Sequence, residues 1–392
     1  MTIQEINYQL IETDEQLRQF AEENKGIQWM GFDTEFVGEK RFYTLLCLIQ
    51  ISTENGYYII DPFGVKDMTP FLEMMTNEAI LKFTHAGEND YKLLYSIYGI
   101  VPKNIFDTQV AAGFAGYRYP ISFKGLVEGE LGISLKKGYA MTDWQQRPMS
   151  KKQIEYALND VTPLYRLWQS LTKKLKAANR YDWAMEEIAI FEDVNYYRQD
   201  PDKEAISSNM MKSLKLQERL FLLRLLRWRT EKAMERNYSK EMILPNKQIS
   251  QIVRSVPSGV KGIKGNRHIS PRFSNRYAEF FYKLYSQKST KEERAILEKI
   301  KREDVLTQEE EVLIEFLYLL VKYRCIEEDI STSLVIAKSG IKKLSTDKAL
   351  LEKFRKSKWK RAFLGESLFK WLQAPHKLKI IVNNSTIEIV EK

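Results

Sequence analysis

The stretch WMGFDTEF (residues 29–36) decides the predicted fold. Apolar residues surround two acids that stand two positions apart. Because side chains alternate along a strand, an extended segment carries Asp33 and Glu35 on one face and turns Phe32 and Thr34 to the other. The stretch therefore predicts a strand that presents two carboxylates together.

Strand patterns alternate with helix patterns through the first half of the chain. The apolar runs YTLLCLIQIS (residues 43–52) and YYIID (residues 57–61) are separated by Asn55-Gly56, which is typical of a tight hairpin turn. The pattern as a whole predicts a mixed sheet covered by helices. The other predicted elements are helices at 13–24, 88–98, 110–116, 126–131 and 151–175, the last interrupted at Pro163, and strands at 28–35, 81–84 and 104–107.

Beyond about residue 176 the pattern becomes almost entirely helical. Leu214–Arg236 carries apolar residues at helical spacing, and Glu311–Arg324 is a second strong helix. The final segment, KLKIIVNNSTIEIV (residues 377–390), alternates about Asn383-Asn384 and predicts a hairpin. An α/β domain followed by helical modules is the predicted organisation.

Composition excludes several classes of protein. The chain has 392 residues, enough for two or three domains, and its two cysteines, Cys47 and Cys325, rule out a disulfide framework and a cysteine-rich zinc site. The start, MTIQEINYQLIETDEQL, lacks the features of a secretory signal. The sequence has no run of about 18 apolar residues, so no membrane span is predicted. The formal net charge of +9 fits a polyanionic partner or an evenly mixed surface.

Four acids and one tyrosine form the candidate catalytic set. Asp33 and Glu35 share a predicted strand face, and Asp90 lies near the start of a predicted helix. Tyr156 precedes Asp160 by one helical turn, so their side chains share a helix face. Hydrolysis of a phosphodiester by two divalent cations needs hard oxygen ligands, which carboxylates supply. Three histidines in the whole chain argue against a histidine-rich centre.

Three motifs around these residues resemble those of a known family. FDTEF, HAGENDYKLL and YALNDV look like the three exonuclease motifs of the DEDD superfamily, in order, and the tyrosine four residues before the last aspartate marks the DEDDy branch. The flanking segments IFDTQVAA (residues 105–112) and TDWQQRPMSKKQIEYA (residues 142–157) resemble ribonuclease D. The resemblance covers about residues 20–175.

The resemblance implies a role for each member of the set. Asp33, Glu35 and Asp160 would bind the ion that activates water, and Asp33 would bridge to a second ion supported by Asp90. Two Mg²⁺ or Mn²⁺ ions are the implied cofactors. Tyr156 would orient the attacking water rather than lose its proton, because a phenol titrates near pH 10. Taken singly, each side chain also has a structural explanation, as a strand-end acid, a packing tyrosine or a helix-end aspartate.

Other positions of the resemblance have two interpretations. Gln109, Trp144 and Arg147 match family positions near the site, and Gln109 and Arg147 are candidate nucleic-acid contacts. Arg147 would touch phosphate or form a salt bridge. His85 stands at a strand-to-helix turn, where a structural hydrogen bond is favoured over catalysis.

The helical remainder also resembles known modules. Residues 209–290 look like the helicase-and-RNase-D C-terminal (HRDC) module, and residues 305–373 look like a more divergent copy. Lys264, Arg267 and Arg272 lie in glycine-rich turns and at a helix start, which suits phosphate binding, with a solvated basic face as the alternative.

A second basic segment, KFRKSKWKR (residues 353–361), interleaves aromatic residues with cations. Its Phe354 and Trp359 would stack on single-stranded nucleic acid, or would be buried on an amphipathic helix.

Together these observations predict an RNase H-like α/β exonuclease domain, a mixed sheet flanked by helices, followed by all-α HRDC-like helical modules. The predicted domains are residues 1–205, 206–295 and 296–392, the last with the terminal hairpin. The resemblance implies a 3′→5′ exoribonuclease that releases nucleoside monophosphates from single-stranded 3′ ends of RNA such as tRNA precursors. The alternatives are a Werner-type 3′→5′ DNA exonuclease, a non-catalytic nucleic-acid-binding protein and a helical adaptor. We expect a cytoplasmic monomer without organic cofactor or membrane association.

Overall fold

The chain forms two units. The structure, a computed structural model, describes residues 6–135, 142–198, 200–300, 307–346, 348–373, 378–383 and 386–391. One unit comprises Met1–Glu35, Leu46–Tyr197 and Leu306–Lys392, and the other comprises Phe36–Leu45 and Arg198–Val305. The domain boundaries expected at residues 205 and 295 stay predictions.

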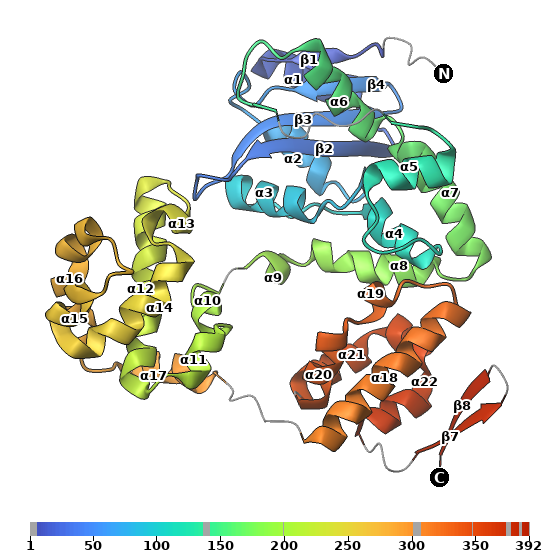
Figure 1. Cartoon of the computed structure of the whole chain (residues 1–392). Coiled ribbons are helices and arrows are strands. Elements are labelled where there is room, and N and C mark those ends of the chain that lie inside the picture. Colours follow the sequence, from blue (N-terminus) through green and yellow to red (C-terminus); the bar gives the residue numbers. More distant parts are fainter. Residues whose placement is uncertain are drawn as a thin grey trace. The chain divides into compact units, whose positions relative to one another are not determined.

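The first unit contains a six-stranded mixed sheet, in the order β1-β4-β3-β2-β5-β6 (Figure 1). β4 is antiparallel to β3 and parallel to β1, and β5 is parallel to β2 and β6. The strands are β1 (Gln9–Ile11), β2 (Trp29–Val37), β3 (Leu45–Thr53), β4 (Gly56–Ile60), β5 (Leu81–Thr84) and β6 (Ile105–Asp107). The predicted mixed sheet is confirmed, and the strand with the two acids lies in its interior.

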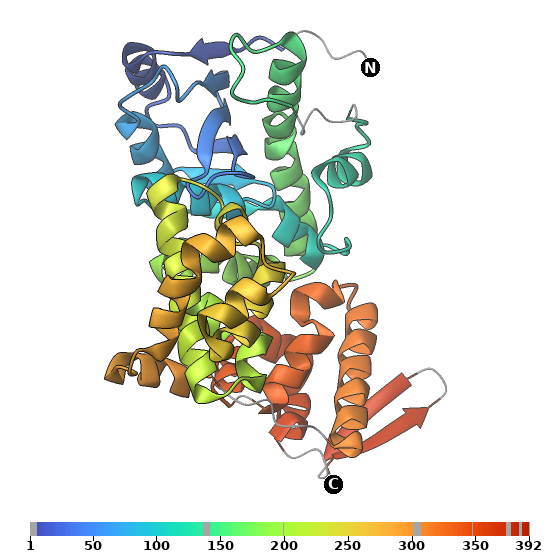
Figure 2. The same ribbon diagram turned by 60° about the vertical axis from the view of Figure 1, so that its left-hand side comes forward.

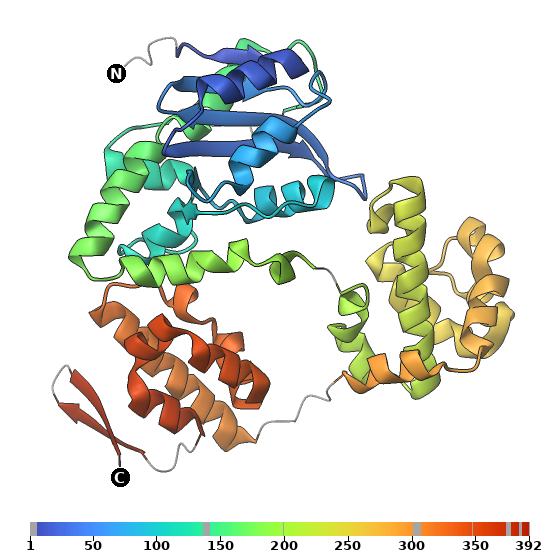
Figure 3. The same cartoon turned by 180° about the vertical axis from the view of Figure 1, so that it is seen from behind.

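Helices cover both faces of this sheet. Figure 1 shows α6 in front of the strands, and Figure 3 shows α1 and α2 on the opposite face. The helices of this part are α1 (Asp14–Glu23), α2 (Thr69–Thr76), α3 (Glu88–Tyr98), α4 (Thr108–Phe114), α5 (Phe123–Leu131), α6 (Lys151–Val161), α7 (Leu164–Ala177), α8 (Tyr181–Ile188), the 3₁₀ turn η1 (Ala189–Glu192) and α9 (Val194–Tyr197).

Local sequence sets the ends of the helix that carries Tyr156 and Asp160. Ser150 and Gln153 form a capping box at the start of α6, with the Ser150 hydroxyl accepting the Gln153 N–H at 3.3 Å. Pro163 separates α6 from α7, as its missing N–H predicts. A β-carbon at Gly31 would lie 2.5 Å from the Ser52 hydroxyl on β3 and 3.1 Å from Leu164 on α7, so glycine permits the close approach of α7 to β2.

The helices after Gln308 pack on the same apolar core as the sheet domain. Trp359 is completely buried, with its ring 4.8 Å from that of Phe114, and its indole N–H donates to Glu187 at 2.8 Å. The interpretation of Trp359 as a base-stacking residue is therefore wrong, because its face is covered by the nuclease core. The elements are α18 (Gln308–Glu327), α19 (Thr332–Val335), α20 (Lys338–Thr346), α21 (Lys348–Lys356), α22 (Lys358–Gln373), β7 (Leu378–Asn383) and β8 (Thr386–Glu391).

The predicted terminal hairpin is present as the antiparallel pair β7–β8, in which Asn383 pairs with Thr386. The turn residues 384–385 lie outside the described residues.

None of the helices in the described part of the chain has the length and apolar character needed to cross a lipid bilayer.

The second unit is built around the long helix α12, and Figure 2 shows its helices in colours that run from yellow-green at α10 through yellow to light orange at α17. Phe221 on α12 is buried against Phe281, and the buried Arg224 forms an ion pair with Glu293 at 2.6 Å. Its helices are α10 (Lys203–Ile206), α11 (Asn209–Ser213), α12 (Leu216–Arg236), α13 (Lys240–Ile243), α14 (Asn246–Ser255), η2 (Val256–Ser258), α15 (Gly259–Gly265), α16 (Pro271–Ser286) and α17 (Lys291–Glu298).

Candidate active site

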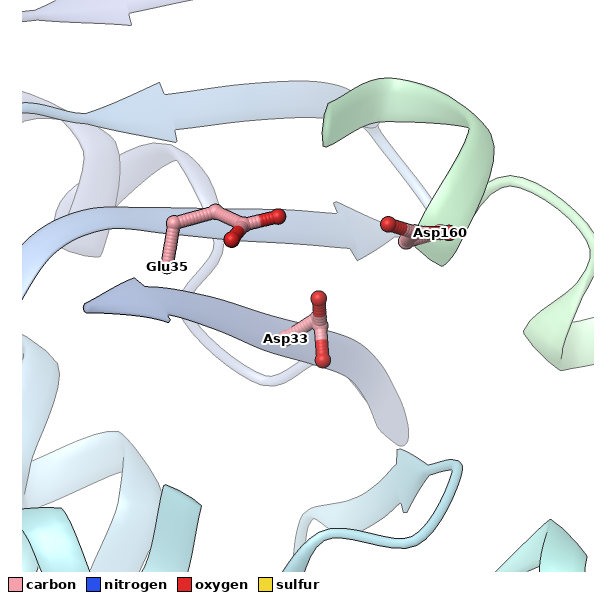
Figure 4. Close-up of side chains that lie close together, drawn as sticks. All are labelled: Asp33, Glu35 and Asp160. Atoms are coloured by element: carbon pink, nitrogen blue, oxygen red, sulfur yellow. The ribbon is translucent and has the colours of Figure 1, made fainter. Parts of the chain in front are cut away.

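The strand β2 presents two carboxylates on one face. Asp33 and Glu35 are half-buried, whereas Phe32, which precedes Asp33, and Thr34, which separates the two acids, are buried on the other side of the strand. This alternation follows from the two-residue repeat of a strand. Figure 4 shows both acids on β2, with Asp160 on the neighbouring helix.

A third carboxylate reaches this face from α6. One carboxylate oxygen from each of Asp33, Glu35 and Asp160 lies within 4.8 Å of the other two. The helix is held against the sheet by the Ser52 hydroxyl, which donates to the Val161 carbonyl at 3.2 Å. Three hard oxygen donors at this spacing fit a divalent cation such as Mg²⁺ or Mn²⁺.

Asp90 lies beside this group rather than within it. The residue is buried near the start of α3, and its carboxylate accepts a hydrogen bond from the Thr34 hydroxyl. Its negative charge nevertheless acts on Asp33, whose pKa it raises. Asp90 thus contributes to the charge of the site from the second face of β2.

The pKa values of the carboxyl groups are raised because the protein separates them from water. Burial is the largest cause for Asp33, whose pKa lies well above its ordinary value, with the charges of Asp90 and Asp160 adding to the effect. Burial raises the pKa of Glu35 to about 9. It also raises the pKa of Asp90 and Asp160 to about 7, although hydrogen bonds from Thr34 and Tyr156 act in the opposite direction.

This electrostatic pattern indicates a cation site. Like charges crowded in a poorly solvated space disfavour ionisation, and a bound divalent cation reverses that cost. The donor set contains only carboxylate oxygens, the ligands that hard cations prefer.

Tyr156 completes the constellation. Its hydroxyl is hydrogen-bonded to Asp160, and burial followed by the charges of Asp160 and Glu35 raises its pKa above the ordinary value. The phenol therefore stays protonated at neutral pH and acts as a hydrogen-bond donor. Its ring lies 5.9 Å from that of the buried Trp144.

The chain matches two protein families and also resembles individual proteins over most of its length. The chain matches the 3'-5' exonuclease family over residues 8–176 and the HRDC domain over residues 218–285. It is 32% identical over 271 residues to ribonuclease D of Acidiphilium cryptum, covering 68% of either chain. It is 30% identical over 314 residues to ribonuclease D of Zymomonas mobilis, covering 79% of this chain and 80% of that protein.

The chain belongs to the ribonuclease D family. Its fold agrees: Escherichia coli RNase D, described as an exoribonuclease involved in structured RNA processing, superposes with a TM-score of 0.80 at 23% identity, over 94% of this chain and 99% of that one. The chain is accordingly a 3′→5′ exoribonuclease, and its exonuclease family depends on divalent metal ions. The predicted family, fold class and enzyme class are confirmed.

Arg147 of this ribonuclease D family member is an ion-pair residue. Its guanidinium binds the buried Asp61 through two nitrogens, and it also donates to the Cys47 carbonyl at 2.8 Å. The ring of Phe63 lies 4.6 Å from the guanidinium carbon. These contacts favour the salt-bridge interpretation, and they anchor the segment that leads into α6.

Gln109 lies in the first turn of α4, and His85, which follows β5, contacts the same turn. Gln109 donates to the Ile121 carbonyl at 2.9 Å, and His85 contacts the Thr108 hydroxyl and that same carbonyl at 3.0 and 3.1 Å. Both His85 ring nitrogens are thus occupied within the fold, which favours its structural interpretation. A nucleic-acid contact by Gln109 stays a prediction.

Asp107 was not among the predicted site residues, although it lies within the segment IFDTQVAA (residues 105–112). Its buried carboxylate accepts four backbone N–H groups from the turn before α3 and from the first turn of α4. The donors are Ala86 at 3.2 Å, Gly87 at 2.9 Å, Gln109 at 2.8 Å and Val110 at 3.2 Å. An aspartate directly before Thr-Gln at a helix start is the N-cap signal that could have identified it.

The predicted basic contacts lie in the second unit. All three are exposed: Lys264 lies on α15, Arg267 follows that helix, and Arg272 lies in the first turn of α16. The Lys264 ammonium lies 3.9 Å from a Glu279 carboxylate. Exposure leaves these cations accessible to phosphate, and their binding role stays a prediction.

Proposed function

We propose that this exoribonuclease shortens structured RNA, such as tRNA precursors, from single-stranded 3′ ends with two Mg²⁺ or Mn²⁺ ions. The observation that carries the proposal is the group formed by Asp33, Glu35 and Asp160 beside Tyr156, in which one carboxylate oxygen of each acid lies within 4.8 Å of the other two. When bound, the divalent ions neutralise phosphate charge and activate water for in-line attack.

The protein side chains have distinct roles in this proposal. Asp33, Glu35 and Asp160 would hold one ion, and Asp33 and Asp90 would hold the second. Asp90 is kept in place by the hydrogen bond that it accepts from Thr34 on β2. Tyr156 donates a hydrogen bond and orients the attacking water, because its raised pKa keeps the phenol protonated.

The reaction is hydrolysis of the last phosphodiester bond. The oxygen of water forms a bond to phosphorus, and the bond from phosphorus to the 3′ oxygen of the preceding nucleotide breaks. The products are a nucleoside 5′-monophosphate and an RNA shortened by one nucleotide with a free 3′ hydroxyl. One water proton passes to solvent and the other protonates the leaving oxygen.

The second unit is proposed to hold the body of the RNA through Lys264, Arg267 and Arg272. Each phosphate contact releases counterions, so binding of long RNA should weaken steeply with salt. The three-domain division at residues 205 and 295, a monomeric state and a cytoplasmic location are parts of the same proposal. Sedimentation of the full chain tests the oligomeric state.

A direct assay tests the activity. A 5′-labelled RNA with a single-stranded 3′ end and the matching DNA are incubated with the full chain in Mg²⁺, Mn²⁺ or EDTA. We expect a ladder of RNA products shortened one nucleotide at a time, mononucleotide release and no reaction in EDTA. Faster degradation of DNA, or internal cuts, would contradict the proposal.

A further inference from the structure

Gln50 is a polar side chain in the middle of the buried strand β3. The residue has no exposed surface, and its neighbours Ile49 and Ile51 are equally buried. It pairs with Ile59 on the adjacent strand β4. A leucine or methionine is the ordinary occupant of such a position, so the amide requires a physical explanation.

The register of the sheet places Gln50 beside Asp33. β2 and β3 are neighbours joined by a connection too short for a parallel crossover, and are therefore antiparallel. A β-carbon at Gly31 would lie 2.5 Å from the Ser52 hydroxyl, which makes these two residues direct partners on the face that α6 covers. In an antiparallel pair, the residue two positions after Gly31 faces the residue two positions before Ser52, so Gln50 stands opposite Asp33 on that same face. The β-carbons of opposite residues are about 4.5–5.5 Å apart.

The amide of Gln50 is unsatisfied in the described part of the chain. Neither its Nε2 nor its Oε1 has a hydrogen-bond partner there, and both atoms are shielded from solvent. Ser52, on the same face of β3, bonds to the Val161 carbonyl of α6, so the helix does satisfy a polar neighbour. Buried polar groups normally find partners, and an exception beside a candidate metal site points to a neighbouring side chain that comes into hydrogen-bonding position when the ion binds.

We propose that Gln50 is a positioning residue of the metal centre, whose amide hydrogen-bonds to Asp33 when the carboxylates hold their divalent cation. This inference rests on the proposed role of Asp33, Glu35 and Asp160 in cation binding. The bond fixes the orientation of the Asp33 carboxylate, and carboxylates that ligate metals are commonly held in this way by neighbouring donors. The amide therefore stabilises the metal-bound protein through this hydrogen bond, whereas in the metal-free protein it is an unpaired buried polar group that lowers stability.

Opposite effects on stability and on metal affinity distinguish this role from ordinary packing. Replacement of an unpartnered buried amide by an apolar group of similar shape is neutral or stabilising. Loss of a hydrogen bond to a ligating side chain lowers metal affinity about 10–100-fold. Gln50→Leu and Gln50→Met are therefore expected to keep or raise the unfolding temperature in EDTA while they weaken cation binding.

The experiment uses the full chain without RNA. Thermal unfolding is measured in EDTA, and Mn²⁺ binding is measured by calorimetry. For both variants we expect an unfolding temperature at or above that of wild type and Mn²⁺ affinity reduced by about tenfold or more. Thr53→Val is the matched control, because the Thr53 hydroxyl bonds to Asn24 on the other face of β3 at 2.7 Å. It should lower stability and leave Mn²⁺ affinity unchanged.

Two results would overturn the inference. If both variants lose stability or fail to fold in EDTA, the amide supports packing and its partner lies within the protein. If they bind Mn²⁺ as wild type does, Gln50 does not position Asp33. Asp33→Asn separates this failure from that of the proposed function, because equal Mn²⁺ binding by Asp33→Asn and wild type would remove the metal site itself.

Discussion

The carboxylate of Asp107 accepts the backbone N–H of Gly87 at 2.9 Å, directly before the helix that carries Asp90. The same carboxylate caps α4, so one side chain fixes the starts of two helices. Gly87 has no room for a side chain, since a β-carbon would lie 2.6 Å from Tyr91. The position of Asp90 against Thr34 therefore depends on a residue outside the group of Asp33, Glu35 and Asp160.

Asp107→Asn should lower activity about 10–100-fold and leave the fold intact. The substitution replaces one carboxylate oxygen by an NH₂ group, which cannot accept a hydrogen bond from a backbone N–H. Initial rates on labelled RNA and circular dichroism measure the two quantities. Asp67→Asn is the control, since Asp67 caps an exposed turn through the Thr69 N–H at 3.1 Å. An Asp107→Asn enzyme as active as this control would show that the start of α3 is fixed by other contacts.

Asp33→Asn and Asp160→Asn should each reduce the rate about 1000-fold, since loss of a metal ligand removes several kcal/mol of transition-state stabilisation. The metal-free protein should become slightly more stable, because a carboxyl group with a raised pKa is removed from the group. Single-turnover assays and unfolding in EDTA measure both effects. Exposed Glu73→Gln serves as control, and activity of Asp33→Asn within tenfold of wild type would contradict the metal assignment.

Tyr156→Phe should lose about 100-fold in rate and retain RNA affinity and Mn²⁺ affinity, because the ring keeps its place near Trp144 and only the hydroxyl is removed. Tyr165→Phe is the matched control on α7, where the hydroxyl accepts an exposed hydrogen bond from Gln169 at 3.0 Å. Equal turnover in the two variants would make Tyr156 a packing residue.

The stability of the metal-free protein should fall as pH rises. Folding raises the pKa of Glu35 to about 9 and those of Asp90 and Asp160 to about 7, so the folded state binds protons more tightly than the unfolded state. This contribution is complete below the unfolded pKa values near 4 and is lost as pH passes through about 7 to 9.

Unfolding temperatures in EDTA between pH 5 and pH 9 test this prediction. Saturating Mg²⁺ should reduce the decline, and Asp160→Asn should flatten it without metal. A metal-free unfolding temperature that stays constant or rises from pH 6 to pH 9 would mean that the carboxylates are better solvated than the structure indicates.

Trp359→Ala should destabilise the first unit by about 3–5 kcal/mol, since a fully buried indole is removed from its contact with Phe114. The salt dependence of RNA binding should not change, because the ring is not available for stacking. Urea unfolding and binding titrations at several salt concentrations separate the two roles. By the same reasoning, a fragment ending near residue 205 should be less stable than the full chain.

The local sequence was sufficient for features whose partners are close along the chain. The two-residue repeat of β2 predicted that Asp33 and Glu35 share a face, and the helical turn between Tyr156 and Asp160 predicted that their side chains share a face of α6, where the structure joins them by a hydrogen bond. Pro163 predicted the helix break, because its effect is confined to its own turn. β1 and α2 were not predicted, since three and eight residues carry too little periodicity.

The sequence by itself determined the identity of the acids, their order and the strand and helix that carry them. Only the tertiary structure decided that Asp160 comes within 4.8 Å of Asp33, that Gln50 stands opposite Asp33 and that Trp359 is buried on Phe114. The reason is physical. Periodicity and capping arise from neighbours within a few residues, whereas packing brings together segments whose separation in the chain leaves no regular pattern.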